Sequence, residues 1–219
     1  MEAFDWQWQE SLLNEMLDSL VEQGFYIWDD AIPQALCLAL LNEVQQLEQE
    51  GEMYKAGIGR GDDHQLKSDV RRDKIKWLDG NTTSQILYLK MMAELQFQIN
   101  RALFLGLFEY EAHFALYDKG DFYKRHRDSF KGAANRILTT VLYLNPEWDK
   151  QWGGELLLYP DDDQQQTVLA SVTPQIGRLA IFMSENLPHE VLPTQQPRVS
   201  IAGWFRCNNS LGGQIDPAK

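Results

Sequence analysis

The sequence predicts an α+β fold in which N-terminal helices support a β-sandwich of the jelly-roll type. Helical patterns of apolar residues dominate residues 1–105, and short β-rich segments separated by turn residues follow over 106–206. Because the helices precede the strands instead of alternating with them, the order favours an α+β fold over a parallel α/β fold. A chain of 219 residues, 44% of them hydrophobic, can bury one core, so we expect a single domain over residues 1–219.

The first half of the chain is expected to form a helical buttress over residues 1–105. Its predicted elements are a helix over 8–23, a strand over 25–28, a helix over 33–50, a long loop over 57–76, a strand candidate over 75–78 and a helix over 83–104. Gly24 and Gly51 follow the first two helices, as C-terminal glycines commonly do. Pro33 suits the first position of a helix because its fixed φ angle is helical.

The second half is expected to form the jelly-roll core over residues 106–206, followed by a tail over 207–219. The predicted strands cover 109–117, 121–127, 136–144, 154–159, 167–173, 178–183, 189–193 and 198–206. Gly, Pro, Asn and Asp separate these segments, as in the turns Asp118-Lys119-Gly120 and Asn145-Pro146. Eight short strands with this spacing are typical of a sandwich or jelly roll.

Charge and composition exclude several classes of protein. Residues 1–54 contain 12 acidic residues and no Lys, Arg or His, whereas the rest of the chain is balanced. A pI near 4.7 without a basic stripe argues against a nucleic-acid partner, whose phosphates require basic contacts. No apolar run is long enough for a membrane span, and no secretory leader precedes the helices. With two isolated cysteines, Cys37 and Cys207, these features predict a cytoplasmic protein.

Three residues have the spacing of a metal site. His126 and Asp128 are two positions apart at the end of a predicted strand, so both side chains are expected on one face of it. His189 opens a later strand and can complete the set. Two His and one carboxylate on one face of an ion form the triad of non-haem Fe(II) oxygenases, which leaves three coordination positions open. His64 and His113 lack a partner at such spacing, and we interpret them as surface or structural residues.

Arg198 extends this pattern from a metal site to a co-substrate site. It follows His189 by nine residues and alternates inward with Ser200 on the last predicted strand. Arg binds carboxylates through two parallel hydrogen bonds, which suits the far carboxylate of 2-oxoglutarate when its other end chelates iron. Zinc is the competing interpretation of the triad, because His and Asp also bind zinc, but zinc does not explain the Arg.

Several segments resemble the hypoxia-factor prolyl hydroxylases and, less closely, other prolyl 4-hydroxylases. The matching segments are Val70 to Trp77, Tyr117 to Asp128, Arg136 to Asp149, Gly153 to Leu156, Leu187 to Val191 and Arg198 to Phe205. The resemblance implies a double-stranded β-helix, or jelly roll, with supporting N-terminal helices. The chain departs from the family pattern at Asp118, Arg72 and Met183, which leaves the triad intact and puts the identity of the substrate in doubt.

The resemblance also implies roles for individual residues. His126, Asp128 and His189 would hold Fe(II), and Arg198 would bind 2-oxoglutarate with help from Tyr143 and Ser200. Tyr117 would lie near the chelating end of the co-substrate. The substrate residues implied are Arg136, Tyr123 and Trp204, together with Arg71 and Asp73 in the 57–76 loop.

The activity implied is 4-hydroxylation of a prolyl residue by O2 and 2-oxoglutarate, with ascorbate as a stimulant. The substrate would be another protein, and a bacterial member of the family would be expected to act on elongation factor Tu. Three alternatives remain open from the residues alone: hydroxylation of a free amino acid or other metabolite, demethylation of nucleic acid, and a binding module that senses 2-oxoglutarate or oxygen without turnover. The acidic balance weakens the second of these.

Overall fold

Two antiparallel sheets face each other in the protein. The computed structural model describes residues 6–57, 67–129, 135–162 and 167–207. The larger sheet has the strand order β1-β9-β6-β11-β4-β3-β2, and the smaller has the order β5-β10-β7-β8. The strands of the larger sheet are β1 (Phe25–Trp28), β2 (Tyr54–Lys55), β3 (Lys74–Trp77), β4 (Leu107–Tyr117), β6 (Arg136–Tyr143), β9 (Leu179–Met183) and β11 (Arg198–Cys207). Those of the smaller sheet are β5 (Tyr123–His126), β7 (Leu156–Leu158), β8 (Ala170–Val172) and β10 (His189–Val191).

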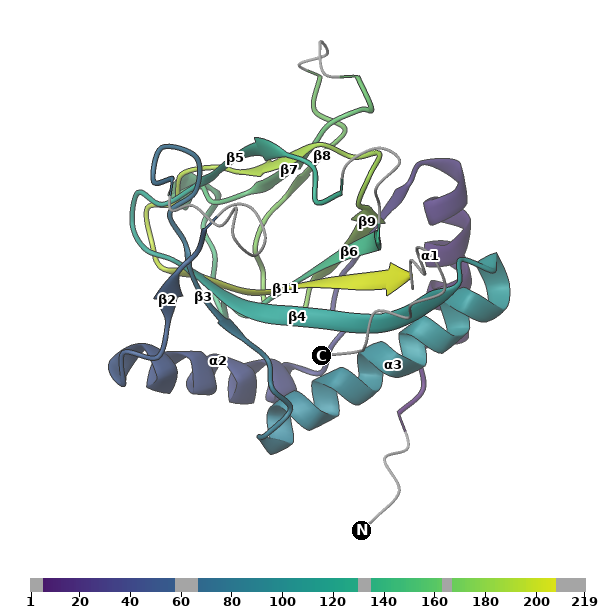
Figure 1. Cartoon of the computed structure of the whole chain (residues 1–219), viewed down its shortest axis with the longest axis horizontal. Helices are drawn as coiled ribbons and strands as arrows, with labels where there is room; N and C mark the ends of the chain where they lie inside the picture. Colours follow the sequence, from purple (N-terminus) through teal and green to yellow (C-terminus); the bar gives the residue numbers. More distant parts are fainter. Residues whose placement is uncertain (1–5, 58–66, 130–134, 163–166, 208–219) are drawn as a thin grey trace, which may run out of the picture.

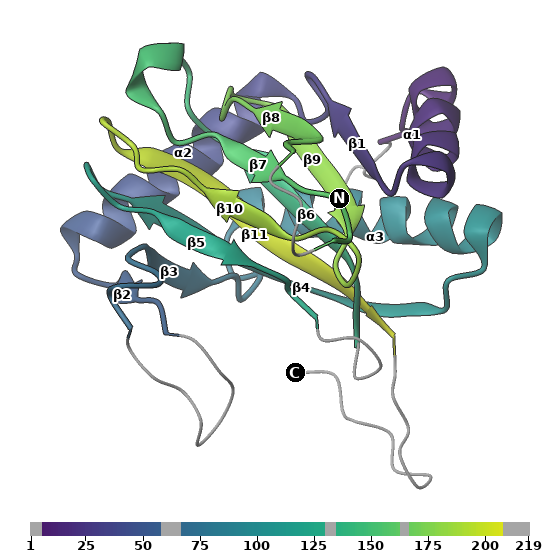
Figure 2. The same ribbon diagram turned by 90° about the horizontal axis from the view of Figure 1, so that it is seen from above.

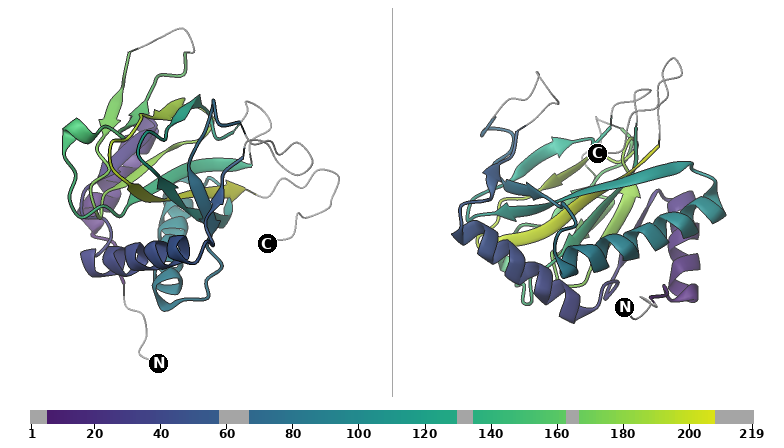
Figure 3. Two further views of the ribbon diagram at one scale, coloured as in Figure 1. Left: turned by 90° about the vertical axis from the view of Figure 1, so that its left-hand side faces the viewer. Right: turned by 60° about the horizontal axis from the view of Figure 1, so that its bottom comes forward.

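The helices cover the outer face of the larger sheet, away from the smaller sheet (Figures 1 and 2). They are α1 (Glu10–Glu22), α2 (Gln34–Gln49) and α3 (Thr83–Leu103), and a short 3-10 helix covers Lys150–Trp152. Figure 3 shows α2 and α3 crossing the same face of the sheet. Among the described residues, no helix combines the length and the apolar character needed to cross a membrane.

Alternation along the strands creates two separate cores. On β4, Phe114 and Leu116 belong to the cluster packed under the helices, whereas Ala115 and Tyr117 belong to the cluster between the sheets. The same alternation runs along β6, β9 and β11, because successive strand side chains point to opposite faces. The larger sheet is therefore buried on both faces. Its inner face, between the sheets, also carries the polar residues of the candidate site.

A carboxylate on α2 fastens the start of α3. Glu43 accepts hydrogen bonds from the side chains of Thr82, Ser84 and Gln85. The Thr82 hydroxyl also accepts the backbone N–H of Gln85, which caps the helix at its first turn. These bonds fix the start of α3 against α2, and through α3 they help to fix the support under β4.

The structure confirms the predicted fold class and most of its elements. All three helices and all eight jelly-roll strands occur within a few residues of the expected bounds. The two-residue β2 and the 3-10 helix at Lys150–Trp152 were not predicted. Most of the predicted tail over 207–219 and residues 58–66 of the predicted 57–76 loop, including His64, lie outside the described residues.

Gly203 on β11 provides a test of the packing under the helices. A Cβ at this position would overlap the phenol ring of Tyr110, which lies against Phe205 with 4.7 Å between ring centroids. Gly203→Ala is therefore expected to lower the free energy of unfolding by about 1–3 kcal/mol, measured by urea denaturation. The loss should be smaller in a Tyr110→Leu background, and an equal loss in both backgrounds would contradict this account.

Candidate metal centre and co-substrate pocket

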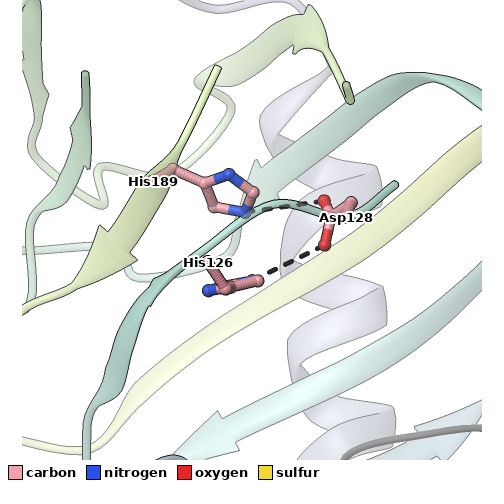
Figure 4. Close-up of side chains that lie close together, drawn as sticks. All are labelled: His126, Asp128 and His189. Atoms are coloured by element: carbon pink, nitrogen blue, oxygen red, sulfur yellow. Dashed lines mark ion pairs between the residues drawn. The ribbon is translucent and has the colours of Figure 1, made fainter. Parts of the chain in front are cut away.

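The three predicted ligands meet between the ends of two paired strands (Figure 4). His126 ends β5 and His189 begins β10, and the two residues are directly paired in the antiparallel ladder. The sequence had suggested that Asp128 lies on the strand with His126. The structure places it instead in the bend that follows β5. The bend turns the carboxylate back toward both rings, so the three side chains still converge.

The distances among these side chains suit a single ion. Nε2 of His126 lies 3.5 Å from Oδ1 of Asp128, and Nε2 of His189 lies 3.5 Å from Oδ2. One ligand atom from each residue falls within 4.8 Å of the others. The set offers two imidazole nitrogens and one carboxylate oxygen, which is the donor set of the Fe(II) facial triad.

Both imidazoles are oriented by the backbone. Nδ1 of His126 lies 2.8 Å from the carbonyl oxygen of Lys124, and Nδ1 of His189 lies 3.1 Å from that of Leu187. A carbonyl only accepts hydrogen bonds, so Nδ1 carries the proton in each ring and the Nε2 lone pair faces Asp128. Backbone geometry therefore selects the tautomer that binds a metal.

Burial adjusts the charge of the site. Burial and the neighbouring His126 ring lower the pKa of His189 to about 4, so this imidazole is neutral near pH 7. Burial alone would raise the pKa of Asp128, but the His189 and His126 rings outweigh it and hold the pKa well below its usual range. A neutral imidazole beside an ionised carboxylate is the protonation state that a cation requires.

Arg198 is buried on the inner face of β11 and has no carboxylate partner among the described residues. It is 1% exposed, and none of the ion pairs among the described residues involves it. Its Nε donates to the carbonyl oxygen of Gly154 over 2.8 Å, and its Nη1 donates to the hydroxyl of Ser200 over 3.2 Å. Nη2 is buried without a hydrogen-bond partner among the described residues. A buried cation held only by neutral acceptors fits an anionic ligand.

Two tyrosine rings lie beside the Arg198 guanidinium. Its guanidinium lies 4.9 Å from the ring centroid of Tyr117 and 5.1 Å from that of Tyr143. The Tyr143 hydroxyl is buried and has no partner among the described residues. Burial raises the pKa of Tyr143 to about 12, so the hydroxyl stays protonated and can donate. Two unused donors therefore lie near each other, as binding a carboxylate requires.

Gly154 makes room for the Arg198 side chain. Its φ is +73°, and a Cβ there would come within 3.2 Å of Cδ of Arg198 and 3.1 Å of the ring of Trp148. From the sequence, Gly154 was only the first residue of the predicted strand over 154–159 and part of the matching segment Gly153 to Leu156. The close approach of the two chains explains why a residue without a side chain is needed there. The residues present fit 2-oxoglutarate: a metal-binding triad, a guanidinium and a phenol share the face between the sheets.

The loop residues predicted to contact substrate connect to the metal centre through Tyr123. The Tyr123 ring stacks on His126 with 3.6 Å between centroids and an interplanar angle of 15°. The guanidinium of Arg71 lies 4.7 Å from the same ring. Arg71 is held by two hydrogen bonds, 2.6 and 2.7 Å long, to the buried carboxylate of Asp73. The structure thus brings these residues together beside His126, one of the predicted metal ligands. Their contact with substrate stays a prediction.

Trp204 and Arg136 form a second group farther along the inner face. The Arg136 guanidinium lies 3.6 Å from the Trp204 ring centroid and pairs with Glu111 over 2.6 Å. His113 lies beside Trp204, with 5.3 Å between the rings, and next to the half-exposed Trp77. Sequence reasoning missed Glu111 and Trp77 as neighbours of this group, because their positions depend on the register of β3, β4 and β11.

Comparisons with known proteins agree with this geometry. Residues 112–206 match the model of the 2OG-Fe(II) oxygenase superfamily. A prolyl-4-hydroxylase from Pseudomonas putida is 36% identical, with a TM-score of 0.80, and the match covers 90% of this chain and all of that one.

Two relatives of lower sequence identity also match most of this chain. A Trichoplax adhaerens prolyl hydroxylase, solved in complex with a hypoxia inducible factor peptide fragment, is 29% identical, with a TM-score of 0.79 and 90% of each chain covered. Human Egl nine homolog 1 is 29% identical over 88% of this chain, which spans 46% of that protein's length.

Two Tyr→Phe variants distinguish a hydroxyl that is predicted to bind 2-oxoglutarate from a hydroxyl that only stabilises the fold. Tyr143→Phe removes an unpartnered donor, so we expect weaker 2-oxoglutarate binding, by about tenfold, with little change in unfolding free energy. Tyr110→Phe removes a hydroxyl bonded to Tyr88 and Thr140, each over 2.8 Å, and should cost about 1 kcal/mol of stability without changing 2-oxoglutarate affinity. Anaerobic calorimetry and urea denaturation measure the two quantities. The opposite pattern would remove Tyr143 from the pocket.

His113 predicts a pH dependence that is independent of the metal centre. Burial, and secondarily Arg71, lower the pKa of His113 to about 4 from an ordinary value of 6.5. Below pH 6.5 the unfolded chain binds a proton that the folded protein does not, so stability falls as the pH decreases toward 4. At pH 5 this loss amounts to about 2 kcal/mol relative to pH 8. Unfolding free energies of His113→Leu should lack this share of the pH dependence, and identical profiles would refute it.

Proposed function

Because the chain belongs to the prolyl hydroxylases of the 2OG-Fe(II) oxygenase superfamily, we propose that it 4-hydroxylates a prolyl residue in an exposed loop of another protein. Members of this superfamily are 2-oxoglutarate-dependent dioxygenases that use Fe(II), 2-oxoglutarate and O2. The observation that carries the proposal is the buried donor pair of Arg198 and Tyr143, whose Nη2 and hydroxyl have no hydrogen-bond partner among the described residues, together with the convergent triad.

His126, Asp128 and His189 would hold the iron through Nε2, one carboxylate oxygen and Nε2. When bound, the iron supplies the oxidising chemistry that splits O2, converts 2-oxoglutarate to succinate and CO2, and places one oxygen atom on the substrate. Arg198 and Tyr143 would hold the far carboxylate and so fix the direction in which the co-substrate reaches the metal. The surrounding core excludes water from this part of the site, which strengthens the guanidinium–carboxylate attraction.

Several features favour a protein as the substrate. Arg71 and Asp73 border the part of the site where Tyr123 covers His126. Trp204 and Arg136 extend the polar and aromatic surface along the inner face of the larger sheet. The Trichoplax relative was solved with a peptide fragment bound. We propose elongation factor Tu as the substrate protein, with Trp204 and Tyr123 near the proline ring and Arg136, Arg71 and Asp73 contacting the surrounding loop.

Ascorbate is proposed as a stimulant of turnover, because a reductant returns oxidised iron to Fe(II) after an unproductive cycle. It has no assigned binding residue. The expected effect is a longer linear phase of succinate formation.

Incubation of the iron-loaded protein with 2-oxoglutarate, O2 and purified elongation factor Tu tests the proposal. Mass spectrometry should find one prolyl residue heavier by one oxygen atom, and hydrolysis should release 4-hydroxyproline. In a parallel incubation with cell lysate, modification of a different protein would replace elongation factor Tu as substrate and keep the reaction. Succinate formation without any modified protein would contradict a protein substrate and favour a free metabolite.

Removal of a triad ligand should abolish the reaction. Asp128→Ala is expected to lower succinate formation by at least about a thousandfold, because the carboxylate supplies a ligand and balances the charge of the ion. Asp18→Ala, an exposed position on α1, serves as the matched control and should retain full activity. Substantial turnover by Asp128→Ala would contradict the assignment of Asp128 as a metal ligand.

A further inference from the structure

Two buried hydroxyls lie behind the Asp128 carboxylate. Thr139 is on the inner face of β6, two residues before Val141, and is 1% exposed. Its hydroxyl lies 2.8 Å from Oδ2 of Asp128 and 2.8 Å from the hydroxyl of Ser184, which is fully buried. The backbone N–H of Ser184 donates to the carbonyl of Ile137 over 3.0 Å, which fixes Ser184 beside the same strand.

The direction of these hydrogen bonds follows from their chemistry. An ionised carboxylate only accepts, so the Thr139 hydroxyl must donate its proton to Asp128. Its oxygen then accepts the proton of Ser184. The two hydroxyls therefore form a chain of two hydrogen bonds, from Ser184 to Thr139 and from Thr139 to one oxygen of Asp128. Thr139 is held in place by strand β6, and Ser184 is held by its backbone hydrogen bond to Ile137.

We infer that Thr139, supported by Ser184, is a positioning residue that makes Asp128 bind the metal through Oδ1 alone. This inference rests on the proposed function of the site. Each carboxylate oxygen faces one imidazole, since Oδ1 lies 3.5 Å from Nε2 of His126 and Oδ2 lies 3.5 Å from Nε2 of His189. The two oxygens differ in that Oδ2 also accepts the Thr139 hydroxyl over 2.8 Å, whereas Oδ1 has no hydroxyl donor among the described residues. One-oxygen binding matters because six positions must serve three protein ligands, two atoms of 2-oxoglutarate and O2. A carboxylate bound through both oxygens would occupy the position needed by O2.

The position of Asp128 makes such support necessary. The residue lies in a bend after β5 and has no strand pairing of its own. Both histidines, in contrast, are fixed by the ladder between β5 and β10 and by backbone carbonyls. Thr139 thus gives the third ligand the fixed orientation that the other two receive from the sheet.

The neighbouring Thr140 provides a matched control. It is also fully buried on β6, but its hydroxyl is bonded to Tyr110 on the opposite face of the sheet. Thr139→Val and Thr140→Val make the same chemical change one residue apart. Thr139→Ser keeps the donor and loses only a methyl group.

Mn(II) titration followed by electron paramagnetic resonance of the unbound ion measures the effect without turnover. Thr139→Val is expected to weaken Mn(II) binding by about 10- to 100-fold, the range typical of residues that orient a ligand. Thr139→Ser should bind within about threefold of the parent protein, and Thr140→Val should bind like the parent while melting at a lower temperature. Ser184→Ala should weaken binding by several-fold, which keeps the test available if Thr139→Val does not fold.

Unchanged Mn(II) affinity in a folded Thr139→Val or Ser184→Ala protein would overturn the inference and leave the proposed function intact. Equal weakening by Thr139→Val and Thr140→Val would also overturn it, because the effect would then be one of general stability. Failure of the proposed function is distinct, since the parent protein itself would then bind no Mn(II) or form no succinate.

Discussion

The burial of Arg198 is the constraint on which the rest of the site depends. Removing a guanidinium from water costs several kcal/mol unless an anion compensates, and among the described residues only the Gly154 carbonyl and the Ser200 hydroxyl accept its hydrogen bonds. An anion bound at this place would therefore find a guanidinium with unused hydrogen-bonding capacity. The co-substrate of this family carries such an anion, and if Arg198 binds it as proposed, 2-oxoglutarate would offset part of the cost of burying the guanidinium.

Strand pairing positions the other residues of the proposed site. β11 lies between β4 and β6, which places Tyr117 opposite Arg198 and Tyr143 opposite Ser200. In the facing sheet, the pairing of β5 with β10 brings His126 and His189 together although they are far apart in the chain. The proposed metal ligands thus come from the smaller sheet and the bend that follows β5, whereas the proposed co-substrate donors come from the larger sheet. Because the two sheets face each other, the proposed site lies between them.

Local patterns in the sequence were enough to predict much of this arrangement. Alternation of apolar residues marked the strands, and the spacing of His126 and Asp128 marked two of the three side chains that converge, because both signals are local and have a fixed period. The position of Asp128 beyond the strand end could not be predicted, since it depends on where the pairing with β10 stops. Contacts that cross the sheet, such as those of Thr139, Ser184 and Glu111, depend on register between distant strands, and no local pattern reports them.

The central claim is that Arg198 recognises the far carboxylate of 2-oxoglutarate. Anaerobic calorimetry on the Mn(II)-loaded protein can compare 2-oxoglutarate with 2-oxopentanoate, which has the same keto acid end and lacks the far carboxylate. The account predicts that 2-oxoglutarate binds at least about 100-fold more tightly, and that the difference largely disappears in Arg198→Met. Equal affinities for the two ligands, or a difference that survives in Arg198→Met, would contradict it.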